Sequence, residues 1–310
     1  MVLAMVAWMV IAIRKSPQPA QPDAIRVLAI GPSGQQLAAG TARGAIAACK
    51  SLDLTDCRTL EADGNLNDLR FSDDGGLAIA DRNIRLSKLD GSPPALVRND
   101  DANYGSVRFE PGGRRLLTID GKGTVLTVDL DTRHASRVYC CSSIWGDVEF
   151  IDQGRQAAWA GHWPAIWDLA AGRLIGRLTA QRETMTFGPI ATDPAGEFLF
   201  MGSQDGRVYR WSVASRQLLS KSNPLTNYVM TISVLGASGW VAYASRPGAV
   251  HLWNPQAGLH RIVPAARASS NIVFSSRRGL AAFGTEAGTL EFWDLIRERL
   301  VETKAPPDGR

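Results

Sequence analysis

Residues 202–211 read GSQDGRVYRW, and this stretch decides the fold. Asp205-Gly206 is a strong signal for a two-residue hairpin turn, because glycine adopts the positive φ that such turns require. The residues after the turn alternate in polarity up to Trp211, as in a β-strand. Further short apolar segments bounded by turn residues lie on either side. The sequence therefore predicts a four-stranded unit with strands at residues 188–192, 198–202, 208–212 and 217–221.

The pattern of a glycine, an alternating strand and a terminal tryptophan recurs along the chain. Clear copies occupy residues 248–254 and 288–294, a shorter copy occupies 164–168, and the copy at 123–129 has valine in place of tryptophan. The weakest copies end at Cys49 and Ser87. The positions equivalent to Trp211 are 49, 87, 128, 167, 211, 253 and 293, at intervals of 38, 41, 39, 44, 42 and 40 residues. A near-constant period of this length is typical of propellers and other repeat folds.

A second marker gives the same count. An apolar residue is followed by a short turn that ends in glycine, and these glycines lie at positions 34, 75, 113, 154, 196, 239 and 279. The sequence therefore predicts an all-β fold, a seven-bladed β-propeller of four-stranded antiparallel blades, preceded by a short N-terminal hydrophobic helix. Residues 299–304 supply a fourth strand for the last repeat. We therefore expect blades in sequence order and closure by packing of the first blade on the last.

These repeats resemble the WD-repeat family over residues 25–304. Trp167-Asp168 and Trp293-Asp294 match its signature dipeptide, and Trp211-Ser212 and Trp253-Asn254 are near matches. The family's Gly-His pair before the first strand is missing, since the single Gly161-His162 lies in a hairpin turn. The resemblance implies a propeller in which these tryptophans fill the space between blades. The expected structural signature is Trp167, Asp168, Trp211, Trp253, Trp293 and Asp294.

The chain has 310 residues, is 45% hydrophobic and 21% charged, and carries a formal net charge of +4. This composition supports a large core and excludes a disordered chain. Residues 1–15 form an apolar segment that ends at Arg14-Lys15, which we interpret as a membrane anchor or signal-like helix. Residues 16–24 form a Pro-rich linker and residues 305–310 a flexible tail. The apolar segment could alternatively pack on the propeller, or Met1 could lie inside a longer anchor.

No motif points to catalysis. The sequence lacks phosphate-binding loops and helical metal-binding pairs, and its four histidines fall on three repeats. His251 is expected on a strand with its side chain in solvent. We expect no cofactor, no metal and no nucleic acid, and a non-catalytic scaffold that binds protein partners. The alternatives are an exported enzyme or small-ligand binder that uses the channel mouth, and a sensory or scaffold domain of a larger membrane protein.

One set of positions suggests where a partner binds. The apolar residue that opens each copy of the second marker is called the apolar anchor below. The residue five places before each apolar anchor is expected where the inter-blade loop enters the innermost strand, near the channel mouth. Aromatic and methionine side chains on such a rim suit a protein-binding hot spot. The alternative is that they seal the gaps between inner strands. The candidate rim residues are Leu66, Tyr104, Trp145, Phe187 and Met230.

The cysteines provide information about the cellular compartment in which the propeller is located. Cys49 and Cys57 flank a short loop between neighbouring strands and could form a disulfide, whereas the adjacent Cys140-Cys141 are expected as thiols. A disulfide implies an oxidising compartment, while Arg14-Lys15 favour a cytoplasmic flank. We expect a membrane-anchored protein with the propeller outside the cytoplasm, the alternative being a cytoplasmic propeller with reduced cysteines.

Overall fold

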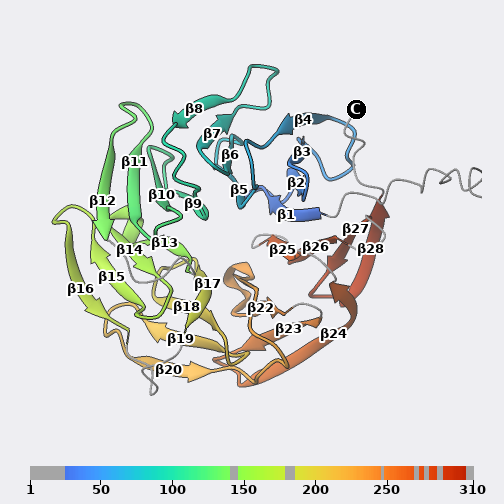
Figure 1. The fold of residues 1–310 in the computed structure, drawn as a ribbon. Coiled ribbons are helices and arrows are strands. Elements are labelled where there is room, and N and C mark those ends of the chain that lie inside the picture. Colours follow the sequence, from blue (N-terminus) through green and yellow to red (C-terminus); the bar gives the residue numbers. More distant parts are fainter. Residues whose placement is uncertain are drawn as a thin grey trace, which may run out of the picture.

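The computed structural model describes residues 25–304 except for six short internal gaps, at 140–145, 179–185, 246–247, 269–271, 276–278 and 285–288. The described strands form seven four-stranded sheets, arranged as the blades of a ring (Figure 1). In every sheet the strands follow one another in sequence order and pair in antiparallel fashion. The predicted seven-bladed propeller is therefore confirmed. Residues 1–24 and 305–310, which include the expected helix, linker and tail, lie outside the described part.

The strand bounds are as follows. Blades 1 and 2 comprise β1 (Ile25–Ile30), β2 (Leu37–Thr41), β3 (Ala45–Cys49), β4 (Cys57–Glu61), β5 (Asp68–Phe71), β6 (Leu77–Ala80), β7 (Ile84–Ser87) and β8 (Ala95–Arg98). Blades 3 and 4 comprise β9 (Ser106–Phe109), β10 (Arg115–Ile119), β11 (Val125–Asp129), β12 (Ala135–Tyr139), β13 (Val148–Ile151), β14 (Gln156–Trp159), β15 (Ala165–Asp168) and β16 (Arg173–Arg177). Blades 5 and 6 comprise β17 (Phe187–Thr192), β18 (Phe198–Ser203), β19 (Val208–Ser212), β20 (Leu218–Lys221), β21 (Thr231–Val234), β22 (Val241–Ala244), β23 (Gly248–Asn254) and β24 (Leu259–Ala268). Blade 7 comprises β25 (Ile272–Ser275), β26 (Leu280–Gly284), β27 (Leu290–Asp294) and β28 (Arg299–Lys304).

Seven apolar clusters hold the ring together, and each joins two neighbouring blades. Alternate residues of one strand enter different clusters: Ala38 of β2 faces blade 2, whereas Leu37 and Ala39 face blade 7. Both faces of a blade are thus buried, which explains why second strands such as LAIA and VAYA are continuously apolar. Because successive strand residues point to opposite faces, a blade needs a neighbour on each side to bury its apolar surface.

Three of the four tryptophans expected to fill the space between blades lie in the clusters described above. Trp211, Trp253 and Trp293 are buried, and each packs in the cluster shared with the preceding blade. Trp211 meets Phe187 edge to face, with ring centroids 5.2 Å apart. Trp167 is only half-buried.

The acidic residue of the signature dipeptide caps a turn. Asp168 Oδ1 accepts hydrogen bonds from the backbone N–H groups of Ala170 and Ala171, at 3.0 and 2.9 Å. Asp294 does the same for Ile296 and Arg297. These side chains fix the turn between the third and fourth strands, the usual role of aspartate in a tight turn.

The ring closes where blade 7 meets blade 1. All four described strands of blade 7 come from the end of the chain, and none of the described residues before β25 pairs with them. Ile25, Leu28, Val273 and Phe292 belong to the cluster that spans this seam, and β1 lies beside β25 (Figure 1). Blade order and closure by packing agree with expectation.

A disulfide stabilises the loop that packs at the interface of blades 7 and 1. Cys49 and Cys57 are cross-strand partners joined by a disulfide, at the base of the loop between β3 and β4. Leu52 and Leu54 of this loop pack against the seam cluster, and the Leu52 carbonyl accepts a 2.7 Å hydrogen bond from Lys304 Nζ of β28. The disulfide therefore holds in place the loop that spans the first and last blades. Cys140 and Cys141 lie outside the described residues.

No helix within the described residues is long and apolar enough to cross a membrane.

The disulfide makes a measurable contribution to stability. Replacing both cysteines (Cys49→Ala with Cys57→Ala) should lower the free energy of unfolding of the oxidised protein by about 2–3 kcal/mol, because the cross-link restricts the unfolded chain. Urea unfolding followed by tryptophan fluorescence measures this, and reduction of the wild type should give the same loss. Equal stability of the oxidised, reduced and double-variant proteins would show that the disulfide does not secure the seam.

Candidate functional site

The candidate site is the central channel, which contains a cavity of about 750 Å³. Innermost strands and the loops that lead into them form its wall. On β5, β9 and β13 the polar residues lie two positions apart, in the pairs Asp68 and Arg70, Ser106 and Arg108, and Asp147 (just before β13) and Glu149. The residue between each pair is fully buried in a cluster between blades. Strand alternation thus turns these polar side chains to the side opposite the blade core.

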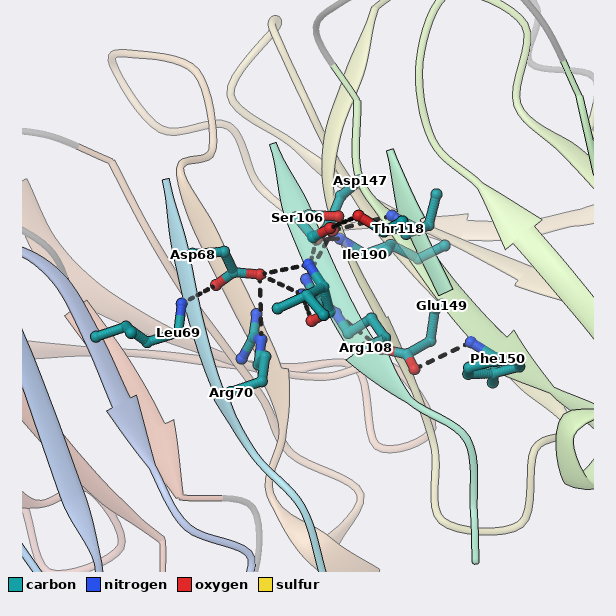
Figure 2. Close-up of polar contacts among 12 residues, drawn as sticks. Asp68, Leu69, Arg70, Ser106, Arg108, Thr118, Asp147, Glu149, Phe150 and Ile190 are labelled. Carbon is teal, nitrogen blue, oxygen red and sulfur yellow. Dashed lines mark hydrogen bonds and ion pairs between the residues drawn. The ribbon is translucent and has the colours of Figure 1, made fainter. Parts of the chain in front are cut away.

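Arg108 is the centre of the charged part of the wall (Figure 2). Its Nη1 donates to Asp68 Oδ2 at 2.7 Å, and its Nη2 donates to both oxygens of Asp147 at 2.6 Å. Its Nε lies 3.6 Å from Glu149 Oε2. Burial opposes the charge of this guanidinium, but Asp147, Asp68 and Glu149 together raise the pKa of Arg108 above its ordinary value. Arg108 is therefore a permanent cation.

The carboxylates also join blades to one another. Asp68 Oδ2 accepts the backbone N–H of Val107 at 3.1 Å, which connects blade 2 to blade 3. Asp147 accepts the N–H of Val148 at 2.9 Å and that of Ile190 at 3.4 Å, which connects blade 4 to blade 5. With the two ion pairs of Arg108, the chain of contacts runs across four consecutive blades. We call the group formed by Asp68, Arg108 and Asp147 the clasp, because it joins blades and each of its carboxylates already has several partners.

Glu149 differs from the two aspartates. Burial raises the pKa of its carboxyl to about 7, with a further contribution from Asp147, and these effects outweigh the opposing influence of Arg108. Its Oε1 accepts the N–H of Phe150 at 3.1 Å. A carboxyl that titrates near neutrality is a feature of catalytic sites and also of buried ion networks. The contact with Arg108 Nε makes Glu149 part of the ion network around Arg108.

The opposite part of the wall is uncharged. Thr186, Ser203, Gln204 and Ser245 contribute polar groups from blades 5 and 6. Tyr228 and Met230 lie in the loop that leads into β21, with 54% and 36% of their surface exposed. Val229 between them is buried in the cluster of blades 5 and 6. This anchors the segment and leaves its two neighbours at the cavity.

The structure corrects most of the expected rim. Leu66, Tyr104 and Phe187 are 2%, 0% and 1% exposed, and each packs between two blades. They seal gaps because the chain turns into the innermost strand there and directs these side chains between the sheets. Their interpretation as exposed hot-spot residues is wrong, and the sealing alternative fits. Met230 alone of the described candidates is substantially exposed.

Tyr104 illustrates how such a residue is held. Its hydroxyl donates to Asp100 Oδ1 at 2.8 Å and accepts from Arg98 Nε at 3.3 Å. Burial raises the pKa of Tyr104 to about 12. Trp145, the remaining candidate, lies outside the described residues.

His251 is also not where we expected it. It is half-buried, and its Nδ1 lies 3.3 Å from His260 Nε2, which in turn lies 2.8 Å from the Tyr243 hydroxyl. Burial, with a contribution from His260, lowers the pKa of His251 to about 4, so the pair is neutral at physiological pH. Within the described ranges, no group of three or more His, Cys, Asp or Glu side chains is placed to hold a metal ion.

The residues that line the charged wall were missed from the sequence, although they carry a signal. The segments Asp68–Phe71, Ser106–Phe109 and residues 147–150 read DLRF, SVRF and DVEF. Polar, apolar, polar and aromatic residues thus recur in three successive repeats. Attention to the apolar anchors alone overlooked the charged residue directly before each anchor.

No protein-family model matches the chain, and no curated protein matches it in sequence. The propeller fold is shown by the structure, whereas the likeness to WD repeats rests on the tryptophan-containing dipeptides and the repeat period.

The shifted pKa of Glu149 predicts a pH-dependent stability. The folded state retains the proton up to about pH 7, whereas the unfolded chain releases it near the ordinary value of 4.5. The folded state therefore binds more protons in this window, and the contribution of Glu149 to stability falls as the pH rises from about 4.5 to about 7. Glu149→Gln should gain stability relative to the wild type across that window and keep the gain above it.

Urea unfolding of both proteins at intervals from pH 4.5 to 8 measures the difference. Two parallel stability curves would contradict a buried carboxyl that titrates near neutrality.

Proposed function

We propose that this protein is a non-catalytic scaffold of the WD-repeat type that binds a protein partner at the mouth of its channel. The observation that carries the proposal is the exposure of Trp163, Tyr228 and Met230, which expose 42%, 54% and 36% of their surface. Large aromatic and sulfur-containing side chains are enriched in protein interfaces, and they contribute most when a partner covers them.

Trp163 lies at the same end of the blades as Tyr228. Its turn connects β14 to β15, and the carbonyl of Gly161 in that turn accepts a 3.1 Å hydrogen bond from the N–H of Phe187, the first residue of β17. Arg177 lies over the Trp163 ring, 5.2 Å from its centroid. The exposed aromatic residues therefore belong to the end of the ring where the inter-blade loops enter the innermost strands.

The charged wall supports a binding role over a catalytic one. Arg108, Asp68 and Asp147 satisfy one another, so their arrangement is accounted for by the joining of blades. The cavity of about 750 Å³ nevertheless favours a second candidate, a small-ligand binder that uses the same mouth. Both the scaffold and the small-ligand binder are compatible with a propeller that forms part of a larger membrane protein.

The proposed setting is a propeller tethered to a membrane through residues 1–15 and located outside the cytoplasm. The Cys49–Cys57 disulfide supports this location, because such bonds persist in oxidising compartments. The net charge of +4 gives no reason to propose nucleic acid as a partner.

Photocross-linking in the producing cells tests the scaffold. A benzophenone amino acid at position 228 or 163 should yield a discrete protein adduct, because a partner covers those side chains. The matched control is position 219, since Leu219 is 48% exposed on the outer strand β20 and lies away from the mouth. Tyr228→Ser combined with Met230→Ser should abolish the adduct formed from position 163 and leave the thermal unfolding midpoint unchanged. Adducts that are equally abundant from position 219, or absent from both mouth positions, would overturn the proposal.

A further inference from the structure

We propose that the channel binds a carboxylate group between Arg26 and Arg70, with Ser106 as an additional hydrogen-bond donor. This site is distinct from the exposed aromatic residues at the mouth. It rests on the proposed function only for the source of the carboxylate, which would be an acidic side chain of the bound partner.

The first observation is that the two arginines are not engaged as Arg108 is. Arg108 donates to two aspartates and to the Val107 carbonyl. Arg70 makes no hydrogen bond to the described residues, and its Nε lies 3.6 Å from Asp68 Oδ2. That Nε is buried and has no hydrogen-bond partner there. A buried N–H without a partner is costly, and a ligand oxygen would satisfy it.

The second observation is Arg26. It is an exposed residue of β1, the innermost strand next to β5, and it lines the same cavity as Arg70. It makes no ion pair with any described residue. Blades 1 and 2 therefore present two guanidinium groups to one cavity, and neither has a carboxylate within hydrogen-bonding distance in the described chain.

The third observation is Ser106. It is 6% exposed and lines the cavity from β9, and its hydroxyl has no hydrogen-bond partner within the described residues. Its backbone carbonyl accepts a 2.6 Å hydrogen bond from the hydroxyl of Thr118. A buried hydroxyl and a buried guanidinium N–H, both unsatisfied and both on the cavity wall, indicate a ligand that accepts hydrogen bonds.

The charges of the side chains that line the cavity favour a carboxylate over a phosphate. The cavity is lined by three cations, Arg26, Arg70 and Arg108, and by two anions, Asp68 and Asp147. Three minus two leaves one positive charge when Glu149, which contacts Arg108 but does not line the cavity, keeps its proton, and a single carboxylate neutralises that charge. A phosphate dianion would overcompensate this charge and meet the two aspartates. Arginine also pairs with carboxylates through two parallel hydrogen bonds, a geometry that fixes orientation.

The rest of the wall suits a short aliphatic carrier for the carboxylate. Val27, Leu28, Leu66, Ile232 and Ile272 line the cavity, and methylene groups would contact them. A glutamate side chain has this composition, an apolar stem that ends in a carboxylate. Free short-chain carboxylic acids share the chemistry, so the test must separate the two sources.

Calorimetric titration at constant ionic strength tests the site. The probe is N-acetylglutamate N-methylamide, and the control ligand is the corresponding glutamine derivative, which has the same shape without the charge. The wild type should bind the probe saturably and at least tenfold more tightly than the control ligand. Arg26→Gln and Arg70→Gln should each weaken probe binding at least tenfold, and Ser106→Ala should weaken it by a smaller factor. Arg70→Lys, which keeps the charge and loses the paired hydrogen bonds, should fall between the wild type and Arg70→Gln.

Arg173→Gln is the matched control variant, because Arg173 is exposed on the outer strand β16 and does not line the cavity. It should bind the probe as the wild type does. Far-UV circular dichroism and urea unfolding verify that each variant is folded. Equal affinity for the glutamate and glutamine ligands, or binding that survives in both channel variants, would overturn the proposal.

Two further arms separate the source of the carboxylate from the scaffold itself. Glutarate tests a free acid, and the capped peptide Gly-Phe-Glu-Leu-Gly tests an acidic side chain within a chain. Peptide binding at least tenfold tighter than glutarate binding, and weakened by Tyr228→Ser, would support a partner side chain. Equal binding that does not depend on Tyr228 would support a free acid, and the carboxylate site would stand even if the cross-linking experiment failed.

Discussion

The distribution of charge in the channel depends on the ion pairs of one side chain, Arg108. Arg108 places a permanent positive charge between two carboxylates that come from the blades on either side of its own. Without it, Asp68 would keep only the 3.6 Å ion pair with Arg70, and Asp147 would have no ion pair within the described residues. A buried charge without a partner costs several kcal/mol. Arg108 carries one positive charge against the two negative charges of Asp68 and Asp147, and Arg70 lies 3.6 Å from Asp68 (Figure 2). Arg26 and Arg70 therefore bring the residues that line the cavity to one positive charge. The ligand site that we infer depends on these two arginines as well as on the clasp.

The clasp is possible only because the rest of each blade is apolar. Every blade buries both of its faces against neighbours, in clusters that recur at all seven interfaces. Charged side chains on the innermost strands are consequently turned toward the channel. The same constraint makes the seam between blades 7 and 1 critical. There the chain adds a disulfide-bound loop and the contact from Lys304 to Leu52.

The repeat period predicted the number of blades and their order, because glycine turns and strand-ending tryptophans are local signals with a fixed spacing. The short loop between two neighbouring strands indicated that Cys49 and Cys57 could pair, and the structure shows the disulfide. The candidate site was harder to predict. Tyr104 and Phe187 lie where the chain enters the innermost strands β9 and β17, as predicted. The direction of a side chain at such a junction, however, depends on backbone geometry that the repeat does not specify. The contacts of Arg108 join residues about 40 positions apart on either side, and only the closed ring brings them together.

The most direct test of this account is the free energy of unfolding of Arg108→Met, measured by urea beside the triple variant Asp68→Asn, Arg108→Met and Asp147→Asn. If Arg108 compensates the two aspartates, the single substitution should cost about 3–5 kcal/mol. The triple variant, which removes the uncompensated charges, should recover most of that loss. A single variant as stable as the wild type, or a triple variant that recovers nothing, would contradict the clasp.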